Sequence, residues 1–84
     1  MECIAVTYCL SKTTSVDQDN YIFHFKGFFM GNKIEAIKVV SKNEEFFIGE
    51  EYILHLRIRE VDKKTLVAKC IRKKVLGEIR SDFL

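Results

Sequence analysis

Basic side chains alternate with apolar ones in the segment at residues 52–59, YILHLRIR. Successive side chains of a β-strand point to opposite faces, so this alternation predicts one face in a core and one cationic face in solvent. The positive charge continues beyond the next turn, because the stretch from Arg57 to Lys74 holds eight Lys and Arg residues and two acids. Such a row of cations has the chemistry to neutralise the phosphates of a nucleic acid.

Binding to single-stranded nucleic acid without sequence preference needs cations along the backbone and exposed rings on which bases stack. The candidate cations, on the predicted strands or directly after one, are Lys26, Lys38, Arg57, Arg59, Lys69, Arg72 and Lys73. The candidate stacking rings are Phe28 and Phe29, which stand beside a predicted turn. The plainer alternative is a solvated surface for each cation and core packing for each ring.

No residues stand in the spacing of a catalytic or metal site. His24 and His55 lie in the middle of predicted strands, and no Ser/His/Asp order or phosphate-cradling glycine loop is present. Cys3, Cys9 and Cys70 form no CxxC pair, and two of the three lie in apolar β runs where cysteine usually packs. We therefore expect a protein without enzymatic activity, cofactor or metal.

The length of 84 residues predicts a single domain, residues 1–84. Hydrophobic residues make up 48% of the chain, which is too apolar for disorder, and aromatic residues without any Trp or Pro favour sheet. The net charge of +2 hides an asymmetry, since residues 1–50 carry five Lys and seven acids and residues 51–84 carry nine basic residues and five acids. A polyanionic partner is therefore expected for the second part.

The location follows from the cysteines and from the first residues. An odd number of cysteines favours reduced thiols, as in the cytoplasm. Glu2 stands where a secretory leader would carry positive charge, and no apolar run approaches the length of a membrane span. We expect a cytoplasmic protein with no membrane partner.

Five strands are predicted, at residues 1–10, 21–30, 33–40, 52–60 and 65–72. The first is apolar on both faces, as for a strand covered on two sides, and Gly27 in the second marks a bulge or bend. The polar run at residues 11–20 is a loop, and Ser41 to Glu51 has room for one helical turn. The tail at residues 73–84 fits a short helix or a sixth strand. Short strands in two hairpins predict an all-β fold, a small antiparallel barrel.

This pattern resembles the OB-fold (oligonucleotide/oligosaccharide-binding) class in its five strands, in Gly27 breaking an aromatic strand, and in the phrase IGEEYIL at residues 48–54. The segment KGFFM at residues 26–30 is similar to the Lys-Gly-Phe-Gly-Phe motif of cold-shock domains, with Phe29 in place of the second glycine. The resemblance implies an OB-like barrel that binds single-stranded DNA or RNA. An Sm-like or SH3-like barrel fits the same strand count.

The sequence thus predicts a non-catalytic module that binds single-stranded DNA or RNA by phosphate neutralisation and aromatic stacking, with residues 11–20 as a clamp. The alternative is a protein-interaction module, a small β-barrel subunit whose exposed phenylalanines dock onto another copy or onto a larger partner. The phenylalanine pairs considered for this role are Phe28 with Phe29 and Phe46 with Phe47.

Overall fold

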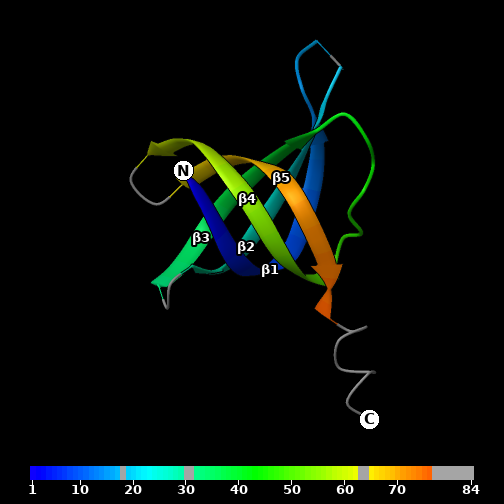
Figure 1. Cartoon of the computed structure of the whole chain (residues 1–84). Helices are drawn as coiled ribbons and strands as arrows, with labels where there is room; N and C mark the ends of the chain where they lie inside the picture. The colour runs from blue at the N-terminus through cyan, green and yellow to red at the C-terminus, as the bar shows by residue number, and fades with distance from the viewer. Residues whose placement is uncertain (18, 30–31, 63–64, 77–84) are drawn as a thin grey trace.

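Five strands form a closed barrel in the computed structural model, which describes residues 1–17, 19–29, 32–62 and 65–76 (Figure 1). The strands are β1 (Glu2–Thr14), β2 (Tyr21–Phe29), β3 (Asn32–Ser41), β4 (Glu51–Asp62) and β5 (Thr65–Val75). Their order around the barrel is β1-β2-β3-β5-β4, and β4 closes onto β1. The predicted all-β, five-stranded, OB-like barrel is confirmed.

One strand pairing differs from the prediction of an antiparallel barrel. β3 and β5 run parallel, with residues 36–39 opposite residues 65–68, whereas the other ladders between described strands are antiparallel. Parallel strands need a long crossover connection. The β3–β4 connection together with β4 supplies that crossover, so the barrel is mixed.

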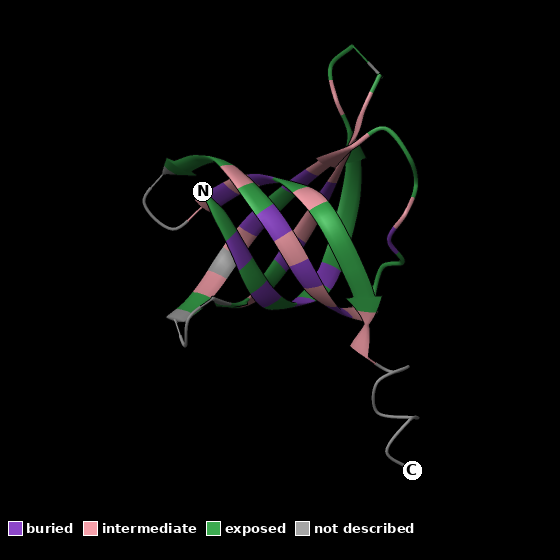
Figure 2. Ribbon diagram, in the orientation of Figure 1, coloured by how far each residue is buried: buried purple, intermediate pink, exposed green. Residues whose placement is uncertain are grey.

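The inward side chains of all five strands fill the barrel. Figure 2 shows the resulting alternation of buried and exposed residues along the strands. The largest fully buried side chains are Tyr52, Phe23, Phe25, Ile37, Leu54, Leu56, Val39 and Cys9. Phe23 and Phe25 therefore belong to the core.

The connection between β3 and β4 closes one end of the barrel with Phe46. The ring centroid of Phe46 lies 4.9 Å from that of Phe23, 5.1 Å from Phe25 and 5.2 Å from Tyr52. Each contact is edge-on, the arrangement that aromatic quadrupoles favour. The next residue, Phe47, is 77% exposed, and its backbone N–H donates to the Tyr52 hydroxyl at 2.7 Å. Phe46 is thus a plug that fixes this connection, which contains turns and bends but no helical turn.

β1 is covered on one side only, contrary to the sequence prediction. Its inward side chains, which are buried, are Cys3, Ala5, Thr7 and Cys9. Its outward apolar side chains are exposed: Ile4 to 64%, Val6 to 43%, Tyr8 to 38% and Leu10 to 42%. In a closed barrel each strand has one interior and one exterior face, and the described residues form no second layer over β1.

β1 and β2 approach each other at Gly27 so closely that no side chain fits. A Cβ atom at this position would lie 2.2 Å from the carbonyl oxygen of Val6. The pairing of β2 with β3 also shifts register between Phe25 and Gly27. The predicted irregularity at this glycine is therefore present, and its cause is the contact between two backbones.

Two element boundaries differ from the sequence prediction. β1 continues to Thr14, so the loop before β2 begins at Ser15, whose N–H donates to the Asn20 carbonyl at 2.9 Å. The resulting hairpin projects from the barrel (Figure 1). β5 runs to Val75, so the first part of the predicted tail belongs to the barrel. The predicted short helix or sixth strand otherwise falls on residues 77–84, outside the described residues.

Candidate nucleic-acid interface

The pairing of β4 with β5 brings three of the predicted cations close together. Arg57 is the direct cross-strand partner of Lys69. Arg59 is the extra residue in a register shift, because Ile58 pairs with Ala68 and Glu60 with the preceding residue of β5. Such bulges redirect side chains. This bulge explains why the Arg59 side chain turns toward the place where β3 and β5 separate.

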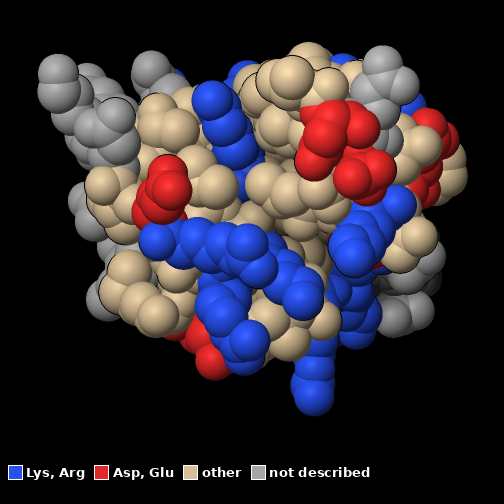
Figure 3. All heavy atoms as spheres, turned by 90° about the horizontal axis from the view of Figure 1, so that it is seen from above, with Lys and Arg blue, Asp and Glu red and all other residues tan. Residues whose placement is uncertain are grey.

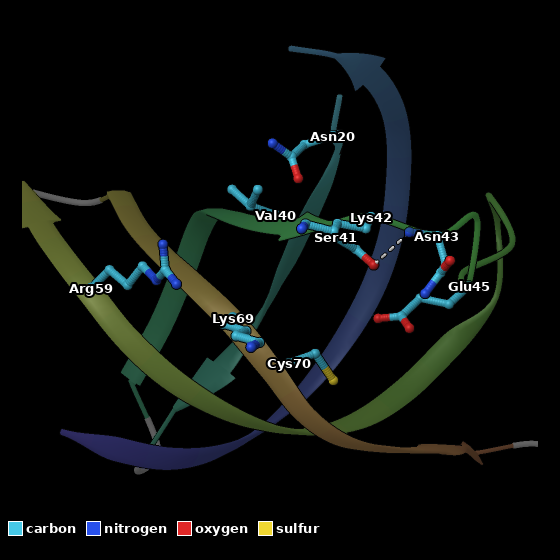
Figure 4. A pocket seen from close by; sticks show the side chains of 9 residues that line it. All are labelled: Asn20, Val40, Ser41, Lys42, Asn43, Glu45, Arg59, Lys69 and Cys70. Atoms are coloured by element: carbon cyan, nitrogen blue, oxygen red, sulfur yellow. Dashed lines mark hydrogen bonds between the residues drawn. The ribbon is translucent and has the colours of Figure 1, made fainter. Parts of the chain in front are cut away.

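β3 and β5 separate where their short parallel ladder ends. The ladder stops at Val39 on β3 and Ala68 on β5, although both strands continue. A cleft of about 500 Å³ occupies the space beyond these two residues (Figure 4). We call it the basic cleft, and its lining residues are Asn20, Val40, Ser41, Lys42, Asn43, Glu45, Arg59, Lys69 and Cys70.

The basic cleft carries a net positive charge. Its described lining includes three cations, Lys42, Arg59 and Lys69, against the single carboxylate of Glu45. None of these three cations forms an ion pair with any residue in the described part of the chain. Viewed from the side on which the β1–β2 hairpin projects, Lys and Arg side chains gather across the middle of the molecule, with acidic groups around them (Figure 3).

Three predicted cations lie on the outer surface beside the basic cleft. The guanidinium of Arg57 is 3.6 Å from the Glu2 carboxylate, and that carboxylate lies 2.9 Å from His55 Nε2. These groups are exposed or half-buried, so their attraction is weak and screened by salt. Arg72 is the cross-strand partner of His55, and Lys38 is exposed in the middle of β3. They extend the cationic surface without lining the basic cleft.

Lys73 contacts the Phe46 plug and does not join the cations on the outer surface. It pairs across the strands with Leu54, whose side chain faces the core. Its Nζ lies 4.9 Å from the ring centroid of Phe46 and donates to the carbonyl oxygen of Glu45. Lys73 therefore stabilises the β3–β4 connection that forms one wall of the basic cleft.

The predicted residues on β2 lie far from the basic cleft. Asn20 lines the cleft and precedes β2, whereas Phe28 is near the other end of that strand, about 25 Å away at the usual rise per residue. Phe28 is 56% exposed, and the Nζ of Lys26 lies 5.5 Å from the ring centroid of Tyr8. The backbone of Phe29 ends β2, and its side chain lies outside the described part of the structure.

A second hollow, of about 260 Å³, lies at this end of β2. Its lining residues are Val6, Thr7, Tyr8, Lys26, Gly27, Phe28, Lys33 and Glu51. The absence of a side chain at Gly27 allows the two strands to meet here. The structure therefore divides the predicted site between two surfaces that share no lining residue.

Sequence reasoning missed several residues of these surfaces. Lys42, Asn20 and Asn43 lie in connections, and their only sequence signal is that polar residues flank strand ends. The sequence gives no signal that Tyr8 is exposed, because both faces of β1 are largely apolar. Its exposure depends on which face the closed barrel turns inward.

The described residues offer no obvious reactive group. Burial, assisted by the nearby Glu45 carboxylate, raises the pKa of the Cys70 thiol to about 11, so this thiol is protonated at neutral pH and is a poor nucleophile. Burial also raises the pKa of Cys3 and Cys9. In the described ranges, no group of three or more His, Cys, Asp or Glu side chains is placed to hold a metal ion. No described helix has the length and apolarity to cross a membrane.

Comparison with known proteins adds no relative. Neither models of protein families, nor curated proteins, nor solved structures match this chain. The functional interpretation therefore depends on the barrel, its charges and its two surfaces.

Proposed function

We propose that this protein is a non-catalytic cytoplasmic module that binds single-stranded nucleic acid, DNA or RNA, in the basic cleft. The observation that carries the proposal is the gathering of Lys42, Arg59 and Lys69 around one cleft without ion-pair partners among the described residues. Cations held apart from carboxylates remain available for phosphates. The three unpaired cysteines support a reducing compartment.

Phosphate neutralisation is the main source of affinity in this proposal. Each phosphate that a cation neutralises releases condensed counterions, so the affinity falls as the salt concentration rises. Asn20, Ser41 and Asn43 add side chains that hydrogen-bond to phosphates, sugars or base edges. A cleft of about 500 Å³ has the size of a small-ligand site, which suits one strand better than a duplex.

Base stacking contributes less than the sequence suggests. The described lining of the basic cleft contains no aromatic ring. A strand that also stacked on Phe28 would have to extend about 25 Å, to the other end of β2. We therefore assign binding to the cleft, with the neighbouring Arg57, Arg72 and Lys38 as the outer phosphate contacts.

Fluorescence anisotropy with labelled DNA and RNA single strands of about 20 nucleotides, titrated with salt, tests this proposal. Replacing Arg59 and Lys69 together by Ala should lower the magnitude of the logarithmic salt slope by about 1.4, because each lost phosphate contact removes about 0.7. The matched control replaces Lys33 and Lys74 by Ala, which removes the same charge at two positions that do not line the cleft. Equal effects of the two double variants, or an unchanged slope in the first, would contradict the assignment.

The alternative function, docking to a protein, draws on a different surface. The exposed outer face of β1 supports it, and this face shares no residue with the lining of the basic cleft. The two functions are therefore separable by mutation.

A further inference from the structure

The outer face of β1 carries a continuous run of apolar side chains. The register places Phe28 of β2 on one side of Val6 and Ile53 of β4 on the other. We call this surface the apolar stripe, and its members are Ile4, Val6, Tyr8, Leu10, Phe28 and Ile53. Single exposed apolar residues are ordinary, but a contiguous set of this kind marks an interaction surface.

The edges of the apolar stripe carry opposite charges. In the row through Tyr8, Lys26 of β2 is the partner on one edge and Glu51 of β4 is the partner on the other. A two-fold axis parallel to β1 would place a second copy face to face and exchange these edges. Each Lys26 would then face the partner's Glu51, so the apolar stripe is complementary in charge to itself.

The shape of the apolar stripe agrees with the same symmetry. In the row through Val6, Phe28 and Ile53 lie on opposite sides. The two-fold axis brings the partner's Ile53 over Phe28. The hollow of about 260 Å³ beside Gly27 lies at this place and offers room for an apolar side chain.

We propose that this protein forms a homodimer through the apolar stripe, with the two β1 strands face to face about a two-fold axis parallel to them. The occupant of the stripe is a second copy of this chain, because one rotation pairs apolar with apolar and Lys26 with the partner's Glu51. The protein partner of the alternative function is then a second copy of this chain, and this dimer does not depend on nucleic-acid binding. Where both hold, the dimer carries two basic clefts, and one long strand that reaches both gains avidity.

Sedimentation equilibrium of the whole protein from about 1 to 200 μM tests the dimer. The expected mass is twice that of the 9.8 kDa chain. Val6→Lys puts a charge at the centre of the stripe and should raise the dimer dissociation constant at least about 100-fold. The matched control is Val16→Lys, because Val16 is fully exposed on the β1–β2 hairpin and should leave the dimer unchanged. Circular dichroism and thermal unfolding show whether each variant is folded.

A charge exchange tests the symmetry itself and does not require a buried substitution. Lys26→Glu and Glu51→Lys should each weaken the dimer about tenfold, since like charges then meet across the interface. The double variant restores opposite charges at both edges and should recover most of the affinity. A monomer at the highest concentration overturns the proposal, as does a dimer that Val6→Lys leaves intact or a double variant without rescue.

Failure of this proposal is distinguishable from failure of the proposed nucleic-acid binding. The same variants are titrated with the labelled oligonucleotides. A dimer that binds no oligonucleotide supports the apolar stripe and rejects the function of the cleft. A monomer that binds oligonucleotides in a salt-dependent way does the reverse.

Discussion

The basic cleft and the apolar stripe are both built on the outer surface of the same barrel, and they differ in how their strands pair. The cleft lies where the β3–β5 ladder stops after Val39 and where a bulge redirects Arg59. The stripe lies on β1, which pairs with β2 and β4 along its two edges. Interrupted pairing opens the cleft between β3 and β5, whereas β1 is paired on both edges from Ala5 to Tyr8 and sets its outward side chains in rows.

The two surfaces also differ in the physical origin of their interactions. Attraction of phosphates to exposed cations is electrostatic and is screened over about 10 Å at moderate salt. Association of apolar side chains depends on the area removed from water and is not weakened by such salt. This contrast provides several ways to perturb one surface and leave the other unchanged.

The largest expected effect comes from removing the plug that supports the basic cleft. Phe46→Ala deletes a buried ring that contacts Phe23, Phe25 and Tyr52, and it should cost about 3–5 kcal/mol of unfolding free energy in urea denaturation. Because the plug anchors one wall of the cleft, oligonucleotide affinity should also fall. Phe46→Leu is the milder control, which keeps the site filled with an apolar side chain. A loss below about 1 kcal/mol in Phe46→Ala would show that the ring is not a plug.

The next largest effect is the different response of the two surfaces to salt concentration. With three phosphate contacts in the cleft and three outer ones, raising the salt from about 50 to 200 mM should weaken single-stranded oligonucleotide binding about 300-fold. The dimer should weaken only a few-fold over the same range, because salt screens its Lys26–Glu51 edges but not its apolar contacts. Parallel titrations by anisotropy and sedimentation measure both quantities, and equal salt dependence of the two would remove the distinction between the surfaces.

Alkaline pH should destabilise the lining of the cleft through Cys70. Its pKa is raised to about 11 in the folded protein by burial and by the Glu45 carboxylate, against about 9 when unfolded. The stability that this thiol contributes is therefore complete below about pH 9 and is lost as the pH rises to about 11. At pH 10 the loss should be at most about 1 kcal/mol, because the thiol is partly exposed and water screens its charge.

Cys70→Ala isolates this loss from the other groups that titrate in the same range. Urea denaturation in reducing buffer at about pH 8 and pH 10 gives the change in unfolding free energy for each protein. The decrease should be smaller in Cys70→Ala by at most about 1 kcal/mol. Identical decreases in the two proteins would mean that the thiol is solvated in the fold.

The smallest effect is expected at Glu2, whose exposed carboxylate lies beside the cationic surface. Glu2→Gln removes a carboxylate that contacts His55 and Arg57, and it should change stability by less than about 0.5 kcal/mol because these groups are not buried. Oligonucleotide affinity should rise about twofold as Arg57 is released. Glu44→Gln, which breaks the exposed ion pair with Lys12, is the charge-matched control. The same gain in both variants would point to net charge alone.

Much of the fold could be predicted because alternation along a strand is local information. The pattern of residues 52–59 placed Tyr52, Leu54 and Leu56 in the core, and the structure buries all three. The antiparallel pairing of β2 with β3 is one of the two predicted hairpins. The parallel β3–β5 ladder could not be predicted, since it depends on contacts between strands that are separated by β4.

The candidate site was predicted in part. The sequence identified Arg59 and Lys69, which line the basic cleft, but not Lys42 or Asn20. It also joined Phe28 to these cations, although Phe28 lies near the end of β2 and the basic cleft lies beside Asn20, before the start of that strand. Residue types show what a side chain can bind, and they do not show which side chains become neighbours.

The sequence by itself determined the class of fold, the aromatic core and the cationic character of β4 and β5, because each is written in periodicity and composition. Only the tertiary structure decided that Ile4, Val6 and Tyr8 face solvent, since both faces of β1 are largely apolar and barrel closure selects one of them. It likewise decided that Arg59 and Lys69 share a cleft with Lys42. The physical reason is register: a shift of one residue turns every side chain of a strand to the other face, and register is fixed by packing across the whole barrel.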